Sequence, residues 1–287
     1  MSVVVGEILK AFGGRKDNFP GDPERQIPFP DPTLERLVRK AIGIPTCPIK
    51  RSALWSLASL EARSAQVAGT VKSLVGMHEC GELEKLALHD LWGGTSLRPL
   101  ARLGRLTTLE VGIDDERMLL HGSASYPNRN GIRDLSPLSQ LGRLRRLTLN
   151  HQSIADLAPL ESIRGLEELN LSRNQIENVE PLATLKRLTK LNLTYNCIQD
   201  ISPISNLANL EIAYLYGNPI RDLRPLAERI QTGGRLGSRP KREYEQFACE
   251  LILDVEQCKD NDLAVELLKD KGIKVTSSDL SDFYSSY

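Results

Sequence analysis

The sequence predicts an α/β solenoid, in which short parallel strands stack side by side to form one long sheet. Three observations support this fold class. From Leu144 to Leu210 the chain repeats itself every 22 residues, and a period of this size is typical of solenoids. Each unit opens with alternating apolar and polar residues, as a short strand requires. A proline then recurs at one fixed position, which favours a short helical turn on the opposite, convex side.

The repeat unit has the form L-x-x-L-x-L-x-x-N-x-I-x-x-L-x-P-L, and its positions are numbered from the first Leu. Positions 4 and 6 are expected to point into the core. Positions 3, 5 and 7 are expected to lie on the open, concave side of the strands, called the strand face below. The position 9 amide can bond the N–H and C=O groups left free where the chain leaves the strand. The position 9 residues are Gln152, Asn174, Asn196 and Asn218, and the position 16 prolines are Pro159, Pro181, Pro203 and Pro225.

Less regular repeats precede Leu144. Three further units keep the apolar strand positions and start at Leu57, Leu83 and Leu106. Together they predict about seven repeats over residues 57–231. The interval from Leu106 to Leu144 is 38 residues, which is 16 more than the regular period. The surplus predicts an insertion at residues 114–129 that leaves the repeats directly after a strand.

Residues 1–56 predict a flexible arm followed by a helical N-terminal cap. Frequent glycine and proline in residues 1–30 indicate a mostly extended arm. The segment FPDPTLERLVRKAIG then predicts a helix with Asp31 as N-cap, Pro32 in its first turn and Gly43 at its end. One apolar stripe on this helix is able to seal the first repeat and consists of Leu34, Leu37, Val38, Ala41 and Ile42.

Residues 232–287 are predicted to form a mostly helical C-terminal cap, because a solenoid needs its last repeat covered. Glycines at 231–240 indicate a linker. Apolar residues from Tyr244 to Val255 recur at helical spacing, and a second helix is expected from about Asp262 to Lys271. The stretch IKVTSS fits a brief strand. The alternative is that this end forms a small partner-binding module.

The repeat resembles the 22-residue leucine-rich repeat of internalins. The resemblance is strong from Leu144 to Ile230 and extends back to Leu57, and the helical segment before the repeats is similar to the cap of many bacterial members. It implies a leucine-rich repeat horseshoe whose concave strand face binds other proteins. Secreted members of the family bind host receptors, whereas cytosolic relatives act as scaffolds or regulate enzymes.

Composition and motifs argue against catalysis and against nucleic-acid binding. Lys plus Arg and Asp plus Glu number 37 each, so no general field attracts nucleic acid or a membrane. Walker loop, nucleophile elbow and H-E-x-x-H motif are all missing from the sequence. His78, Glu79 and Cys80 are adjacent but lack the spacing of a metal site. We therefore expect no enzymatic activity, no cofactor and no metal ion.

The cysteines and the N-terminus suggest a compartment. Five widely spaced cysteines without a C-x-x-C pair indicate reduced thiols. The N-terminus does not contain the apolar core of a secretory signal, and no stretch is long and apolar enough to cross a membrane. We expect a bacterial, cytoplasmic protein that is a monomer.

The candidate binding site lies on the strand face and in the insertion. Most of the strand face is small, polar and of mixed charge, but the last strand offers aromatic residues, which are favoured anchors at interfaces. The candidate residues are Arg146, Glu168, Asn170, Lys190, Asn192, Ile212, Tyr214 and Tyr216 on the strands, with Met118, Leu119 and Tyr126 in the insertion. Either a partner or the protein itself must cover the apolar members of this set.

We therefore predict a non-catalytic scaffold that binds a partner protein through the strand face and the insertion. Two alternatives use the same fold. In the first alternative, the protein is a secreted bacterial effector that acts on a host protein. In the second, it is the regulatory subunit of an enzyme. The three predicted functions differ in the compartment of the protein and in the partner that it binds.

Overall fold

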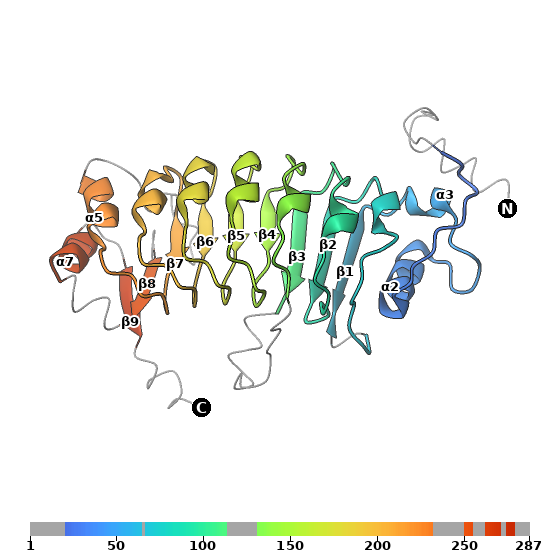
Figure 1. Ribbon diagram of the computed structural model, residues 1–287, viewed down its shortest axis with the longest axis horizontal. Helices are drawn as coiled ribbons and strands as arrows, with labels where there is room; N and C mark the ends of the chain where they lie inside the picture. The colour runs from blue at the N-terminus through green and yellow to red at the C-terminus, as the bar shows by residue number, and fades with distance from the viewer. Residues whose placement is uncertain are drawn as a thin grey trace, which may run out of the picture.

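One parallel sheet runs the length of the molecule. The computed structural model describes residues 21–64, 67–113, 131–231, 250–254, 262–270 and 274–278. In this part of the chain nine strands pair in sequence order, each parallel to the next (Figure 1). They are β1 Ser59–Arg63, β2 Lys85–His89, β3 Thr108–Gly112, β4 Arg146–Thr148, β5 Glu168–Asn170, β6 Lys190–Asn192, β7 Ile212–Tyr214, β8 Glu250–Asp254 and β9 Lys274–Ser278. The predicted solenoid is confirmed.

Short helical segments connect the strands and stack in a row beside the sheet (Figure 1). The α-helices are α2 Pro32–Ile42, α3 Arg51–Leu54, α5 Arg224–Gln231 and α7 Asp262–Asp270. The 3₁₀ segments are η3 Met77–Glu79, η4 Arg98–Leu100, η5 Ser136–Leu138, η6 Ala158–Ser162, η7 Glu180–Thr184 and η8 Ser202–Asn206. From η4 to η8 each 3₁₀ segment carries a proline in its first turn. The fixed φ of proline suits that position, as the repeat pattern predicts.

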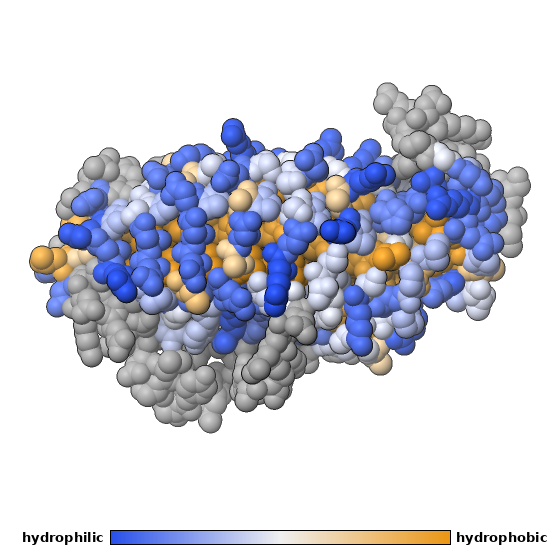
Figure 2. Space-filling view, viewed as in Figure 1, coloured by the Kyte–Doolittle hydropathy of each residue, from blue (hydrophilic) through white to orange (hydrophobic). Residues whose placement is uncertain are grey.

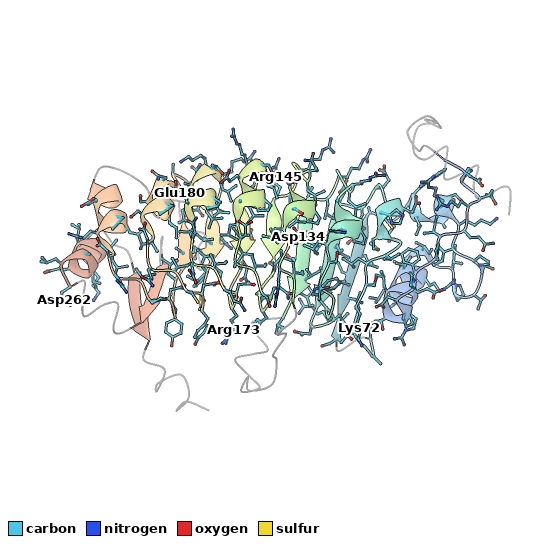
Figure 3. The ribbon with its side chains drawn as sticks, viewed as in Figure 1. Lys72, Asp134, Arg145, Arg173, Glu180 and Asp262 are labelled. Atoms are coloured by element: carbon cyan, nitrogen blue, oxygen red, sulfur yellow. The ribbon has the colours of Figure 1, made fainter. Side chains whose placement is uncertain are left out.

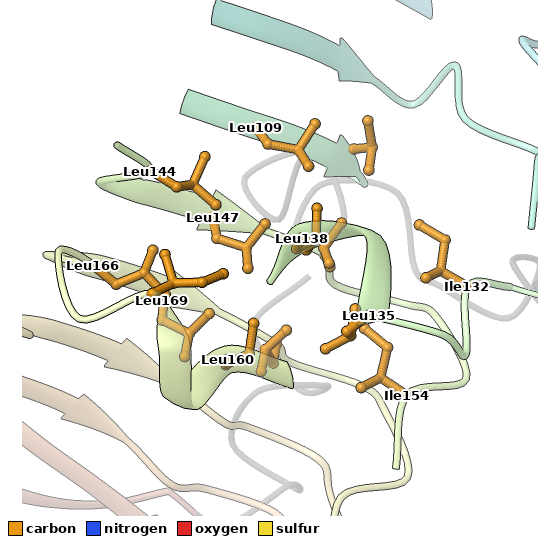
Figure 4. Close-up of a cluster of buried hydrophobic side chains, with 14 of the residues drawn as sticks. Leu109, Ile132, Leu135, Leu138, Leu144, Leu147, Ile154, Leu160, Leu166 and Leu169 are labelled. Carbon is orange, nitrogen blue, oxygen red and sulfur yellow. The ribbon is translucent and has the colours of Figure 1, made fainter. Parts of the chain in front are cut away.

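The core is a stack of aliphatic side chains between the strands and the helical turns. Figure 4 shows Leu144 and Leu147 of one repeat packed beside Leu166 and Leu169 of the next. The position 4 and 6 residues of β4, β5 and β6 are at most 2% exposed. Burying one such side chain contributes about 1.5–3 kcal/mol before entropy costs. Outside this core the visible face is mostly hydrophilic, with apolar residues showing in a band between the ridges (Figure 2).

The position 9 amides form the predicted ladder. Asn196 Oδ1 accepts the N–H of Ile176 at 3.1 Å, and its Nδ2 donates to the C=O groups of Leu171 and Leu193 at 3.0 and 2.9 Å. Asn174 and Asn218 make the equivalent bonds in their own repeats. Each amide therefore satisfies buried backbone groups of its own repeat and of the preceding one.

A second row of side chains caps the helical turns. The carboxylates of Asp134, Asp156, Asp200 and Asp222 each accept the N–H of the residue two positions further on, at 2.8–2.9 Å. Asn178 makes the same bond without a charge. Side-chain hydrogen bonds from Ser136, Ser202 and Arg224, reinforced by these backbone bonds, lower the pKa values of Asp134, Asp200 and Asp222 respectively.

The N-terminal cap is joined to the first repeat by a buried carboxylate. Helix α2 begins after Asp31 and ends at Gly43, which has a left-handed φ of 69°. The side chain of Asp31 accepts four backbone N–H groups, from Thr33, Leu34, Lys72 and Ser73. The buried members of the apolar stripe are Leu34, Leu37 and Val38. Ala41 is exposed, so the stripe is narrower than predicted.

The C-terminal segment contradicts the sequence-based expectation at one element. The apolar spacing from Tyr244 to Val255 predicts a helix, but residues 250–254 form strand β8, which pairs with β7. The register sets Leu251 beside Ala213, a buried position 4 residue. The three apolar residues at 251–253 are too few to distinguish a helical from a strand period, and strand pairing satisfies the open backbone edge of β7. The expected second helix and final strand are present as α7 and β9.

Several predicted features lie outside the described residues. They are the first 20 residues of the arm predicted at residues 1–30, the insertion at 114–129 and the linker after Gln231. The division of the chain at residues 56 and 231 stays a prediction. In the described ranges no helix is long and apolar enough to cross a membrane. The same ranges contain no cluster of His, Cys, Asp and Glu suited to a metal ion.

Three cysteines fall in the described ranges, and all are free thiols. Cys80 is fully buried in the core, whereas Cys47 and Cys197 are exposed. Burial raises the pKa of the Cys80 thiol to about 12, with a smaller contribution from Glu79. Cys80 is therefore a packing residue, as predicted. Cys249 and Cys258 lie outside the described residues.

The core and the amide ladder should both be required for stability. We predict that Leu171→Ala lowers the free energy of unfolding by about 2–5 kcal/mol, because it opens a cavity. Asn196→Ala should cost about 1–3 kcal/mol by leaving buried N–H and C=O groups unpaired. Chemical denaturation measures both, with the exposed Gln175→Ala as a near-neutral control. A neutral Asn196→Ala would show that solvent can replace the ladder.

The aspartate caps should make stability fall in acid. A lowered folded-state pKa contributes stability above the unfolded value, and this stability is lost as pH falls through the folded-state value. For Asp134, Asp200 and Asp222 the loss therefore lies below the ordinary aspartate pKa of 3.8. Replacing all three by Asn keeps the acceptor oxygen, as Asn178 shows. Denaturation between pH 5 and 2.5 should give the triple variant a flatter pH dependence, and an unchanged slope would contradict this assignment.

Candidate protein-binding face

The strand face brings the predicted strand residues onto one surface. Strand register aligns position 3 across Arg146, Glu168, Lys190 and Ile212, and position 5 across Thr148, Asn170, Asn192 and Tyr214. Arg146 and Lys190 are exposed, and the other predicted strand residues are half-buried. The predicted insertion residues Met118, Leu119 and Tyr126 lie outside the described residues.

Charged side chains on this face are paired across neighbouring strands. Arg146 donates two hydrogen bonds to the Glu168 carboxylate, at 2.9 and 2.8 Å. Glu110 lies 3.4 Å from His89 Nε2 and 4.0 Å from Arg146 Nε. The hydrogen bonds between Arg146 and Glu168 lower the pKa of the carboxyl group and raise that of the guanidinium. Exposed pairs of this kind contribute at most about 1 kcal/mol each, so their main effect is to fix side-chain positions.

Aromatic side chains gather at the β7 end of the strand face. Tyr214 and Tyr216 come from the last regular repeat, and Tyr195 comes from the preceding one. The rings of Tyr195 and Tyr216 are 5.1 Å apart and nearly perpendicular, with an interplanar angle of 86°. The guanidinium carbon of Arg173 lies 4.2 Å from the centre of the Tyr195 ring. Arg173 and Tyr195 were missed by sequence reasoning, because they occupy position 8, where the repeat pattern specifies no residue type.

In five repeats the position 8 residue has a left-handed backbone conformation, with a positive φ. The φ values are 57° at Asp90, 54° at His151, 56° at Arg173, 55° at Tyr195 and 70° at Gly217. A left-handed residue costs about 1–2 kcal/mol when it carries a Cβ atom. This conformation turns the chain where each strand ends. The position 8 residues form an edge of the strand face, called the rim below, and Figure 3 shows Arg173 there.

Two position 7 residues and one histidine are more buried than the repeat pattern predicts. Asn150 and Ser172 occupy position 7, but they are 0% and 4% exposed and therefore do not present their side chains to a partner. His151 is also buried. Burial, together with the nearby charge of Arg173, lowers its pKa to about 4. His151 is therefore neutral at neutral pH.

Both ends of the insertion are held by the repeat that follows it. Asn150 Oδ1 accepts the N–H of Ile113 at 2.8 Å, and its Nδ2 donates to the Ile113 C=O at 2.9 Å. On the returning side, Gln152 Oε1 accepts the N–H of Ile132 at 3.0 Å. Gln152 also donates to the Asn150 C=O at 3.0 Å. We call this pair of amides the clamp.

Two glycines make room for the clamp. A Cβ on Gly112 would lie 1.8 Å from Asn150 Oδ1, and a Cβ on Gly131 would lie 2.9 Å from the Gln152 Cα. Such contacts are too close for any other residue without movement of the backbone or the amide. The sequence shows that Gln152 replaces the usual Asn at position 9 and that Gly112 and Gly131 flank the insertion. Only the structure shows that these residues contact one another at the ends of the insertion.

Comparisons with known proteins agree with this geometry. The family model described as "Leucine Rich repeats (2 copies)" matches residues 143–184, 164–206 and 186–228. Residues 143–228 carry leucine-rich repeats, and the fold is similar to that of internalins. Among solved structures, internalin C2 of Listeria monocytogenes is 25% identical with a TM-score of 0.66, and the match covers 90% of this chain and 100% of that protein. A search of curated proteins finds no match.

Two further structures share the leucine-rich repeat fold. An internalin (inlF) of Listeria monocytogenes is 24% identical with a TM-score of 0.67, and the match covers 93% of this chain and 69% of that protein. A leucine-rich repeat protein of Leptospira interrogans is 19% identical with a TM-score of 0.52, and coverage is 80% and 62% respectively. Leucine-rich repeat proteins are generally scaffolds for protein interaction, and this fold is typically non-catalytic.

We predict that a methyl group added at Gly131 disturbs the clamp, whereas one added at Gly142 does not. Gly131→Ala forces its Cβ against the backbone of Gln152 and should lower the free energy of unfolding by about 1–3 kcal/mol. Gly142→Ala is the matched control, because a Cβ there would meet no atom within 4 Å. Chemical denaturation of the two variants makes the comparison. Equal stability of the two variants would mean that the insertion end is not held by Gln152.

Proposed function

We propose that this protein is a non-catalytic scaffold that binds a partner protein through the strand face from β4 to β7 and through the adjacent insertion. The observation that carries the proposal is the aligned surface itself. Its position 3 and 5 side chains are fixed by strand register and by pairs such as Arg146–Glu168. A surface whose side chains are already ordered loses less conformational entropy on binding.

The chemistry of the strand face supports this proposal. Polar groups of both charges between β3 and β6 provide electrostatic complementarity, which sets specificity and orientation. Tyr214 and Tyr216 at the β7 end supply large side chains with polar tips, which are frequent anchors at interfaces. Ile212 adds an aliphatic contact in register with Lys190. The proposed contact residues are thus Arg146, Glu168, Asn170, Lys190, Asn192, Ile212, Tyr214 and Tyr216.

The insertion enters the proposal because of where its ends are held. Ile113 and Ile132 are bonded to the clamp, directly beside the rim residue His151. A long segment that leaves a repeat and returns at a fixed place commonly carries function. We therefore propose that Met118, Leu119 and Tyr126 contribute contacts to the same partner.

We further propose that the protein is a cytoplasmic monomer of bacterial origin. Cys47 and Cys197 are exposed and free. Exposed free thiols persist in a reducing compartment, whereas they oxidise readily outside the cell. The partner is therefore sought first among cytosolic proteins.

The decisive experiment is capture of a stoichiometric partner from the cytosol of the source organism. The double variant Lys190→Glu/Ile212→Arg changes bulk and charge at two neighbouring position 3 residues of the strand face and should abolish capture with little change in the melting temperature. Gln175→Arg, on an exposed loop, is the matched control and should bind normally. Capture that survives in the double variant would place recognition away from the strand face.

Deletion of the insertion tests its contribution separately. Replacing residues 114–129 by a two-residue link should leave the melting temperature nearly unchanged and abolish capture. A much lower melting temperature would show that the insertion is structural. Capture of one enzyme would favour a regulatory subunit, and capture only from a host-cell extract would favour a secreted effector.

A further inference from the structure

Arg173 differs from the other arginines near the strands in what holds it. Several of them pair with a carboxylate, namely Arg145, Arg146, Arg187 and Arg224. No carboxylate among the described residues lies within 4.0 Å of the Arg173 guanidinium. Its neighbour is instead the ring of Tyr195, whose centre is 4.2 Å away. Within the described part of the chain, Arg173 thus carries a positive charge that is held by an aromatic ring and is not neutralised by a carboxylate.

The position of this charge is set by its aromatic neighbours. Tyr216 approaches the Tyr195 ring nearly at right angles, at 5.1 Å. A Cβ on Gly217 would lie 2.5 Å from the Tyr195 Cδ1 atom, so glycine is required beneath the ring. These contacts hold the ring, and the ring holds the guanidinium by a cation–π interaction. We call Arg173, Tyr195, Tyr216 and Gly217 the rim cluster.

The backbone conformation argues that these side chains are present for a purpose other than stability. Position 8 is left-handed in each of the repeats described above, and Gly, Asn, Asp and His are the residues found most often in that conformation. Arg173 and Tyr195 nevertheless occupy it in two consecutive repeats. Strained backbone with bulky side chains is concentrated at functional sites. The strain here coincides with the fixed charge and the aromatic rings.

The charge balance indicates the chemistry of the ligand. His151 stands one repeat before Arg173 and is neutral at neutral pH, so Arg173 supplies the positive charge of this part of the rim. A guanidinium stacked on a ring keeps its N–H edge available for two parallel hydrogen bonds. That edge matches a carboxylate in geometry and in charge. The faces and edges of the tyrosine rings accept apolar groups beside it.

We propose that the rim cluster docks an acidic side chain of the partner protein, with Arg173 binding the carboxylate and the tyrosine rings contacting the adjacent apolar residue. This inference deepens the proposed function and rests on it for the partner being a protein. It places a specific requirement on the surface of the partner protein. The partner presents a Glu or Asp next to an apolar side chain, and that pair lies at the rim, not on the centre of the strand face.

The test uses the full chain and two capped peptides, GELEG and its twin GQLQG. The side-chain Nε–H resonance of Arg173 is followed by NMR during titration at low salt. GELEG should shift this resonance saturably, and GQLQG should bind at least about ten-fold more weakly, because only the carboxylate forms charge-assisted bonds. Added salt should weaken GELEG binding. Equal shifts from both peptides, or no shift from either, would overturn the assignment.

Two variants separate binding from folding. Arg173→Asn suits the left-handed backbone, so its melting temperature should equal or exceed that of the parent while GELEG binding is lost. Arg187→Asn removes an exposed arginine that pairs with Glu167 and should bind GELEG normally. Equal loss in both variants would show non-specific charge attraction. If the natural partner is captured by the strand face yet is indifferent to Arg173→Asn, the rim inference fails and the proposed function stands.

Discussion

Every repeat of this protein must satisfy the backbone groups that it exposes where the chain turns away from the sheet. The position 9 amides form hydrogen bonds with these backbone groups, and the bonds link each repeat to the preceding one. Asn196 accepts a hydrogen bond from the preceding repeat and donates to both repeats. Adjacent repeats are thereby locked in one register, because a shift by one residue would leave buried N–H and C=O groups unpaired. The stacked leucines then pack against one another without adjustment.

This register determines the strand face as well as the core. Equivalent positions recur along straight rows, roughly 4.8 Å apart in adjacent strands. Arg146 therefore meets Glu168, and the same alignment along the rim sets the Arg173 guanidinium against the Tyr195 ring. Recognition by such a surface depends on the sequence of residues along each row. A partner that is extended along the solenoid can contact several repeats through one type of position.

The sequence was sufficient for most of the fold, because leucine, asparagine and proline recur wherever the core, the ladder and the turns require them. It was insufficient where tertiary pairing overrides local period, as at residues 250–254, which extend the sheet beyond β7. Burial of Asn150 could not be foreseen, because its bonds go to Ile113 across the insertion. The rim cluster was missed for a related reason, since Arg173 and Tyr195 meet only when two repeats stack in register.

The clamp has a consequence for how this protein can diverge. The side-chain amides of Asn150 and Gln152, together with the backbone N–H of Ser153, bind Ile113 and Ile132 at the two ends of the insertion, and all three residues belong to the next repeat. These bonds join the repeats on either side of the insertion through residues that lie outside it. We infer that segments of different length and composition are tolerated there. Natural variation in partner choice could thus be confined to one cassette, with the framework inherited intact.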